Sequence, residues 1–177
     1  MTYDALIIID MQTALVNRHP YNEKNVISNI KQLIDCCRTN NVPILYVRHD
    51  GGQGDELERG TTGWEIYSEI APALGERIFD KQYNIAFRKT GLHEYLQLLG
   101  ARTLVMCGIQ TEYCFDVSCK VAFEYGYKVT VAEDTTTTYD NEFSTGEALA
   151  KYYETKIWNN RYARVRSMKQ VLAEIEG

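Results

Sequence analysis

Short apolar runs that alternate with helical stretches constrain the fold of this chain more than any other feature. The first run, residues 5–9, reads ALIII and has no polar residue at any position. Such a run is typical of a strand that is buried on both faces of a parallel sheet. In residues 22–40 the apolar side chains recur instead at three- and four-residue steps, which is the period of an amphipathic helix.

The same alternation continues along the chain. Further strands are predicted at residues 42–49, 77–80, 103–109, 128–134 and 163–165, and further helices at 90–99, 111–125, 143–158 and from 168 onward. Strands that alternate with helices in this way require right-handed crossover connections and a sheet with helices on its faces. We therefore predict an α/β fold of Rossmann type, with three α/β/α layers and a mostly parallel sheet of about six strands.

Composition limits the classes of partner. The chain has 177 residues, of which 45% are hydrophobic, so we expect a single domain over residues 1–177 with one substantial core. The 24 acidic and 19 basic residues give a net charge of −5, which argues against a nucleic-acid partner. No apolar stretch approaches the roughly 20 residues that span a membrane, so we expect no membrane partner. Five cysteines without paired spacing indicate reduced thiols in a cytoplasmic protein.

Polar side chains stand where the predicted strands end. Asp10 ends the first strand, Arg48 and His49 end the second, Lys81 follows the third, and residues 108–114 connect the fourth strand to its helix. Ligands of open parallel sheets bind in the crevice beyond the carboxyl ends of the strands. These side chains are therefore the first candidates for a functional site.

Cys114 has the chemistry of a nucleophile. It lies near the start of a predicted helix, where free N–H groups and the helix dipole lower the pKa of a thiol, so we expect a thiolate. Asp10 is the candidate base, and Lys81 would hold that carboxylate. Taken singly, an Asp at a strand end is commonly a turn residue, a lone Lys lies at the surface and a Cys packs in the core. Their position at three different strand ends of one sheet favours a common site.

Three motifs carry a resemblance to a known family. They are IIIDMQ at residues 7–12, DKQYNIAF at 80–87 followed by TGL at 90–92, and CGIQTEYC at 107–114. In this order the chain resembles the isochorismatase-like cysteine hydrolases, a family that includes nicotinamidase and N-carbamoylsarcosine amidohydrolase. The resemblance runs over essentially the whole chain. It implies a hydrolase that cleaves a C–N bond of a small amide, ureide or carbamoyl compound through a thioester.

The resemblance also assigns roles to individual residues. It implies a catalytic triad of Asp10, Lys81 and Cys114, in which Lys89 has no part. It implies an oxyanion hole formed by the backbone N–H groups of Gln110 and Cys114, with a cis peptide bond between Ile109 and Gln110.

The same resemblance bears on metal and substrate binding. Nicotinamidases carry an Asp-x-His…His metal site, whereas His49 in VRHDGG has no partner at a suitable spacing, and His19 and His93 lie elsewhere. We therefore expect no metal and no cofactor. The side chains that we expect around a small-molecule substrate are Gln12, Trp64, Tyr113, Arg48 and His49.

Other interpretations remain open from the sequence. One is hydrolysis of an ether or ester on the same scaffold, as in isochorismatase itself, although that enzyme lacks a cysteine at the nucleophile position. Another is a non-catalytic α/β domain that binds a small molecule. Family members are commonly oligomers, so we also expect a homo-oligomer, a dimer or higher, in which the aromatic residues of 152–158 are buried.

Overall fold

The predicted strands form one sheet, in which every strand pair is parallel. The computed structural model describes residues 3–177. The strands follow the order β3-β2-β1-β4-β5-β6 across the sheet. Their bounds are β1 Ala5–Ile9, β2 Ile44–His49, β3 Arg77–Lys81, β4 Thr103–Ile109, β5 Lys128–Thr137 and β6 Arg164–Arg166. The prediction of a parallel, six-stranded α/β fold is confirmed.

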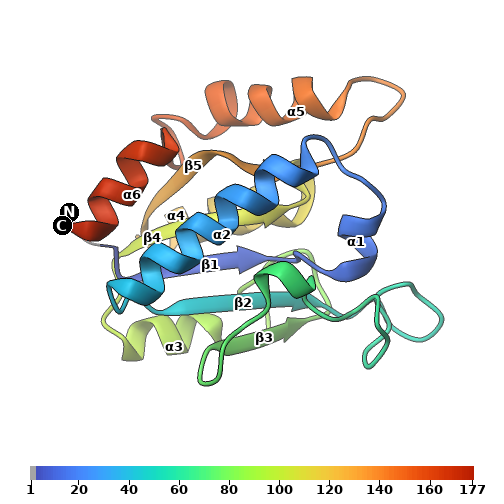
Figure 1. The fold of residues 1–177 in the computed structure, drawn as a ribbon, viewed down its shortest axis with the longest axis horizontal. Helices are drawn as coiled ribbons and strands as arrows, with labels where there is room; N and C mark the ends of the chain where they lie inside the picture. The colour runs from blue at the N-terminus through green and yellow to red at the C-terminus, as the bar shows by residue number, and fades with distance from the viewer. Residues whose placement is uncertain (1–2) are drawn as a thin grey trace.

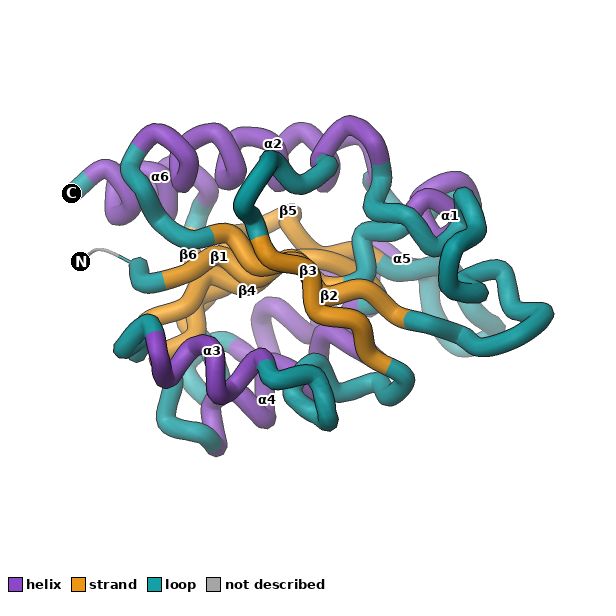
Figure 2. Tube along the Cα trace, turned by 90° about the horizontal axis from the view of Figure 1, so that it is seen from below, coloured by secondary structure: helices purple, strands orange, loops and turns teal. Residues whose placement is uncertain are grey.

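Helices cover both faces of this sheet, which gives the three predicted layers. Figure 2 shows α2 (Glu23–Thr39) and α6 (Met168–Glu176) on one face, with α3 (Leu92–Leu98) and α4 (Asp116–Glu124) on the other. The remaining helical elements are α1 Thr13–Asn17, η1 Ser68–Ile70, η2 Thr111–Phe115, α5 Gly146–Tyr152 and η3 Tyr153–Trp158. Figure 1 shows how helices and strands alternate along the chain.

The apolar runs form strands because both of their faces are covered. Successive side chains of a strand point to opposite faces. Leu6 and Ile8 of β1 therefore pack into one apolar cluster with α2 and α6, while Ala5, Ile7 and Ile9 pack into the other with α3 and α4. All five side chains are fully buried. This double burial is why β1 reads as a continuous apolar run rather than an alternating one.

Some element bounds differ from the prediction. The strand predicted to end at residue 134 continues to Thr137, because the threonines that follow pair with the end of β4. The helix predicted from residue 143 begins at Gly146, where the Thr145 hydroxyl caps it by accepting a hydrogen bond from the Ala148 amide. The short helix α1 was not predicted, since its five residues are too few to show a helical period.

The side chain of Trp158 is not exposed for a contact between subunits. Its side chain is fully buried in the same chain, packs on Phe115 with 4.8 Å between ring centroids, and donates its indole N–H to Asp116 at 2.9 Å. The sequence pattern of this segment therefore reflects the core of the chain itself. Tyr152 is half exposed.

No helix within residues 3–177 is both long enough and apolar enough to cross a membrane.

Candidate active site

The carboxyl ends of four neighbouring strands bring the predicted catalytic residues together. Asp10 directly follows β1, Lys81 is the last residue of β3, and Cys114 lies in η2, which follows β4. His49 ends β2 and pairs with Lys81 in the strand register. The order β3-β2-β1-β4 therefore places these four side chains along one edge of the sheet.

Lys81 is the centre of this group. Its ammonium nitrogen lies 2.7 Å from Asp10 Oδ2, 3.3 Å from Cys114 Sγ and 3.1 Å from His49 Nδ1. The Lys81 side chain is 0% exposed and the Asp10 side chain 2%, so the ion pair is screened very little by solvent. An ammonium has three protons to donate, and here each of them has a partner. The lysine thus links the carboxylate and the thiol.

Asp10 keeps one oxygen free for proton transfer. Its Oδ2 is bound to Lys81, whereas Oδ1 is buried and has no hydrogen-bond partner among residues 3–177. The backbone of Asp10 adopts a left-handed conformation, with φ at 52°, and its amide donates to Val47 O at 2.9 Å. Non-glycine residues in this region are uncommon and gather at functional sites. A buried carboxylate oxygen without a donor is well suited to accept a proton.

The prediction that Cys114 is a thiolate is wrong for the free protein. The pKa of the Cys114 thiol is raised to about 12: burial is the largest cause, the negative charge of Asp10 also raises this pKa, and the positive charge of Lys81 lowers it. The helix dipole was expected to do the opposite, but α4 begins at Asp116, beyond the π-helical turn that holds the cysteine. Because desolvation of the thiolate outweighs the help from Lys81, the thiol stays protonated at neutral pH. A base beside it is therefore required.

The raised pKa predicts how alkylation of Cys114 depends on pH. Iodoacetamide reacts with the thiolate, and below the pKa the thiolate fraction grows tenfold for each pH unit. We expect the alkylation rate to rise about tenfold per unit between pH 7 and pH 10, as measured by mass spectrometry of the peptide that contains Cys114. A rate that is flat over this range would show a thiolate already present at pH 7.

The turn between β4 and η2 carries the two predicted oxyanion residues. The peptide bond between Ile109 and Gln110, for which the family resemblance implies the cis form, is cis in the structure. The amides of Tyr113 and Phe115 both donate to Gln110 O, at 3.1 and 3.2 Å, which closes a π-helical turn around Cys114. Gln110 and Cys114 are thereby held at the same cavity.

A cavity of about 310 Å³ opens directly onto the thiol. This volume is at the lower end of the range for small-molecule sites. The lining residues are Asp10, Leu15, His49, Leu57, Asn84, Ile109, Gln110, Tyr113 and Cys114. Two of the predicted substrate-binding residues, His49 and Tyr113, therefore line the cavity together with Asp10 and Cys114.

The other three predicted substrate-binding residues do not line this cavity. Gln12 is fully buried, and its amide bonds the backbone of His49 and of Trp64. Arg48 pairs with Asp80 at 2.8 Å, and its guanidinium stacks on the Trp64 ring at 3.2 Å from the centroid. Their contacts fix the loop after β2 against the strand ends.

The sequence matches the model of a known protein family. The model of the isochorismatase domain matches residues 4–167, which is most of the chain. The chain belongs to the isochorismatase family. It is therefore a hydrolase, and the recognition of the family from its three motifs is confirmed.

Two relatives and one solved structure of the isochorismatase family are similar to most of this chain. Nicotinamidase 3 of Arabidopsis thaliana is 32% identical over 152 residues, which are 78% of this chain and 75% of that protein. Streptothricin hydrolase of Streptomyces noursei is 29% identical over 138 residues, but the chain spans only 50% of its length. The crystal structure of an isochorismatase from Pseudomonas putida KT2440 superposes with a TM-score of 0.88 at 28% identity, over 94% of this chain and 89% of that one.

Sequence reasoning missed several residues of the isochorismatase-family site. Asn84 lies near the thiol, with its Oδ1 at 3.9 Å from Cys114 Sγ, and Leu15 and Leu57 line the cavity. Asn84 comes three residues after Lys81, so its closeness to the predicted catalytic lysine was a usable signal. Leu57 belongs to a long loop, whose path over the site no local pattern predicts.

Gly108 allows the approach of β4 to β1 just before the cis bond. Its φ is +132°, and a Cβ at this position would lie 2.1 Å from Ile9 O. Both the conformation and the close contact exclude a side chain. We expect Gly108→Ala to lower the free energy of unfolding by about 4 kcal/mol, measured by urea denaturation.

Gly100→Ala is the matched control for this prediction. Gly100 also has a positive φ, at +66°, but nothing lies within 4 Å of the added Cβ, so only the backbone cost of about 1 kcal/mol is expected. Equal losses in the two variants would show that contact with β1 does not matter.

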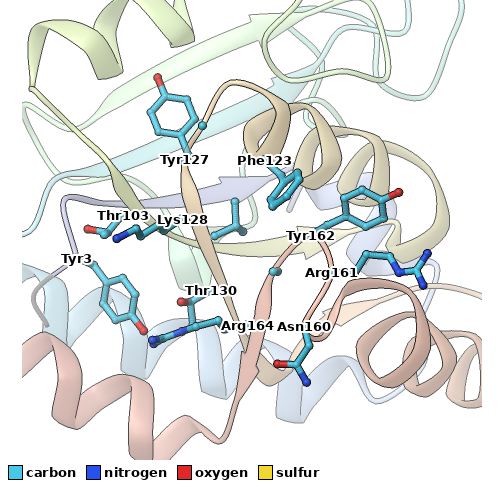
Figure 3. A pocket seen from close by; sticks show the side chains of 13 residues that line it. Tyr3, Thr103, Phe123, Tyr127, Lys128, Thr130, Asn160, Arg161, Tyr162 and Arg164 are labelled. Atoms are coloured by element: carbon cyan, nitrogen blue, oxygen red, sulfur yellow. The ribbon is translucent and has the colours of Figure 1, made fainter.

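A second cavity, of about 580 Å³, lies at the opposite edge of the sheet, where β4 and β5 begin (Figure 3). In Figure 3 the rings of Phe123 and Tyr162 lie next to one another; they meet edge to face, with 5.6 Å between their centroids. Among the described residues that line this cavity there is no acid, histidine or cysteine. It is larger than the cavity at Cys114, but none of the described residues that line it supplies a thiol or a carboxylate.

Proposed function

We propose that the chain is a cysteine-dependent hydrolase that cleaves the C–N bond of a small amide, ureide or carbamoyl compound through a thioester. Asp10, Lys81 and Cys114 are its catalytic residues. The observation that carries this proposal is the position of Lys81, whose ammonium lies within 3.3 Å of both Asp10 Oδ2 and Cys114 Sγ. The similarity to a nicotinamidase, an amidase by its name, favours a C–N bond as the target.

The first step forms the thioester. Asp10 takes the proton of the Cys114 thiol, and the sulfur forms a bond to the carbonyl carbon of the substrate while the carbonyl electron pair moves to oxygen. When the tetrahedral intermediate collapses, the C–N bond breaks and Asp10 returns the proton to the departing nitrogen. The thiol pKa of about 12 makes this proton transfer necessary, because little thiolate exists at neutral pH without it.

The second step releases the acid. A water molecule gives a proton to Asp10 and attacks the thioester carbon, and the sulfur then leaves and recovers its proton from Asp10. The sum of both steps is the hydrolysis of one C–N bond by one water. Lys81 keeps Asp10 in place and balances its charge throughout, and no step requires a cofactor.

The negative charge on the carbonyl oxygen needs donors in both steps. We assign this oxyanion hole to the backbone N–H groups of Gln110 and Cys114, as the family resemblance implies. Both residues line the cavity at the turn that η2 closes. Donors that are fixed before the reaction stabilise such a charge without reorganisation, and one of them is typically worth about 10²–10³ in kcat.

The residues that line the cavity indicate which side chains contact the substrate. His49 and Tyr113 are placed to contact a ligand, together with Asn84 and Leu57. We assign Gln12, Arg48 and Trp64 to the support of the cavity wall. Gln12 donates to the backbone oxygens of His49 and Trp64, and Arg48 pairs with Asp80 and stacks on the Trp64 ring. A small substrate fits the cavity volume of about 310 Å³.

An assay of ammonia release tests the proposal. Primary amides, ureides and carbamoyl compounds of up to about ten heavy atoms are incubated with the purified protein, and esters and vinyl ethers of similar size serve as the comparison set. We expect ammonia from at least one C–N substrate. Hydrolysis confined to the esters and ethers would overturn the assignment of the bond.

A further inference from the structure

We propose that His49 is a fixed hydrogen-bond donor in the active site, which selects uncharged substrates that carry a second carbonyl group beside the scissile amide. This inference rests on the proposed function and deepens it. It rests on the contacts that fix the backbone of His49, on the contact that fixes its imidazole ring, and on the ring nitrogen that has no partner among the described residues.

The backbone of His49 is held by the side chain of Gln12. Gln12 is fully buried, and its Oε1 accepts from the His49 amide at 2.8 Å while its Nε2 donates to His49 O at 2.8 Å. The same Nε2 donates to Trp64 O, also at 2.8 Å. The backbone at the end of β2 is therefore fixed on both sides of the His49 side chain.

Lys81 fixes the ring and its tautomer. The ammonium of Lys81 lies 3.1 Å from His49 Nδ1, and it is protonated because it forms a buried ion pair with Asp10. An ammonium has no lone pair to offer, so Nδ1 must accept its proton. The single proton of the neutral imidazole is then on Nε2.

The ring also stays neutral at working pH. Burial lowers the pKa of His49, and the positive charge of Lys81 lowers it further. A second proton would have to be placed on Nδ1, against the ammonium that already occupies that position. His49 therefore acts as a donor rather than as a cation or a general acid.

The free end of the ring faces the cavity. His49 lines it beside Asp10, Asn84, Gln110 and Cys114. Within residues 3–177, Nε2 has no hydrogen-bond partner, and it is not among the polar atoms that are buried without one. A polar N–H that is held from both sides and left open to a substrate cavity is available for recognition.

The surrounding charges favour an uncharged acceptor. The carboxylates of Asp10, Asp50 and Asp55 all act on His49, and Lys81 is the one cation among the groups that shift its pKa. A substrate carboxylate at this place would be repelled, whereas a carbonyl oxygen would not. His49 ends β2, on the far side of Asp10 from the oxyanion turn after β4, so the second carbonyl belongs to a different group from the one attacked.

Matched substrates and two variants test this role. 3-Oxobutanamide is compared with 3-methylbutanamide and acetylurea with isopropylurea, because each pair differs by one carbonyl oxygen in place of a methyl group. His49→Gln keeps an acceptor for Lys81 and a donor for the substrate, whereas His49→Phe keeps the size of a ring and removes both. Ammonia release gives kcat/KM for each substrate and each variant.

We expect the natural protein to prefer the dicarbonyl member of a pair by at least about tenfold, and to hydrolyse malonamide faster than malonamate. The preference should remain in His49→Gln and fall to within about threefold in His49→Phe. The ratio of kcat/KM within a pair reports recognition of the second carbonyl group alone, because a general disturbance of Lys81 would lower kcat/KM for both substrates of the pair alike.

Two results would contradict the inference. Equal rates for both members of each pair in the natural protein, lost in Cys114→Ala, would overturn the role of His49 and leave the proposed function standing. The same would follow from a preference that survives unchanged in His49→Phe. No ammonia from any amide or ureide would overturn the proposed function, and the role of His49 with it.

Discussion

Replacement of Cys114 by alanine is expected to lower kcat/KM for the amide substrate by at least about 10⁴-fold, because the thioester cannot form without the sulfur. The fold should persist. Cys114 is only partly buried and lines a cavity, so the loss of its sulfur leaves no new void in the packed core. A pre-steady-state assay for ammonia, with the melting temperature measured in parallel, checks both statements.

Cys36→Ala is the control for this variant. Cys36 is also a partly buried thiol, but it lies on α2 and its Sγ faces Leu172 O at 3.8 Å, away from the site. Its replacement should leave kcat/KM unchanged. Full activity in the Cys114 variant would show that the nucleophile is elsewhere.

The second large effect is expected for Asp10→Asn, which should reduce kcat/KM by about 10³-fold because the thiol then has no base. Asparagine tolerates the left-handed backbone of this position, so the change is mainly one of charge. The variant should also lose about 3 kcal/mol of unfolding free energy, since Lys81 is left buried without its partner. Urea denaturation measures that loss.

A double variant separates the two effects. In Asp10→Asn/Lys81→Met no buried charge is left unpaired, so most of the stability should return, while activity should stay at the level of the single variant. Recovery of both would mean that Asp10 serves only to neutralise Lys81. Recovery of stability alone supports its role as the base.

The sheet and the residues of the candidate catalytic group could be predicted from the sequence, for a physical reason. Strands buried on both faces, such as β1, must be apolar throughout, and parallel strands bring their carboxyl ends to one edge. Asp10 and Lys81 could therefore be placed next to one another without knowledge of the loops. The order of the strands supplied the rest.

Loop geometry and desolvation could not be predicted in this way. Gln12 was predicted to contact the ligand, yet its amide is used entirely by the backbone of His49 and Trp64. The pKa of Cys114 depends on how completely the folded chain removes water, and the helix dipole gave the wrong sign. Both depend on contacts between segments that are distant in the sequence.

Detection of the acyl group on Cys114 tests the central claim most directly. The protein is mixed with substrate, quenched in acid within milliseconds and digested, and the peptide that contains Cys114 is weighed by mass spectrometry. We expect an added mass equal to the acyl part of the substrate, on this peptide only and absent from Cys114→Ala. Turnover without any such adduct, and retained in that variant, would contradict a covalent mechanism at the Asp10, Lys81 and Cys114 site.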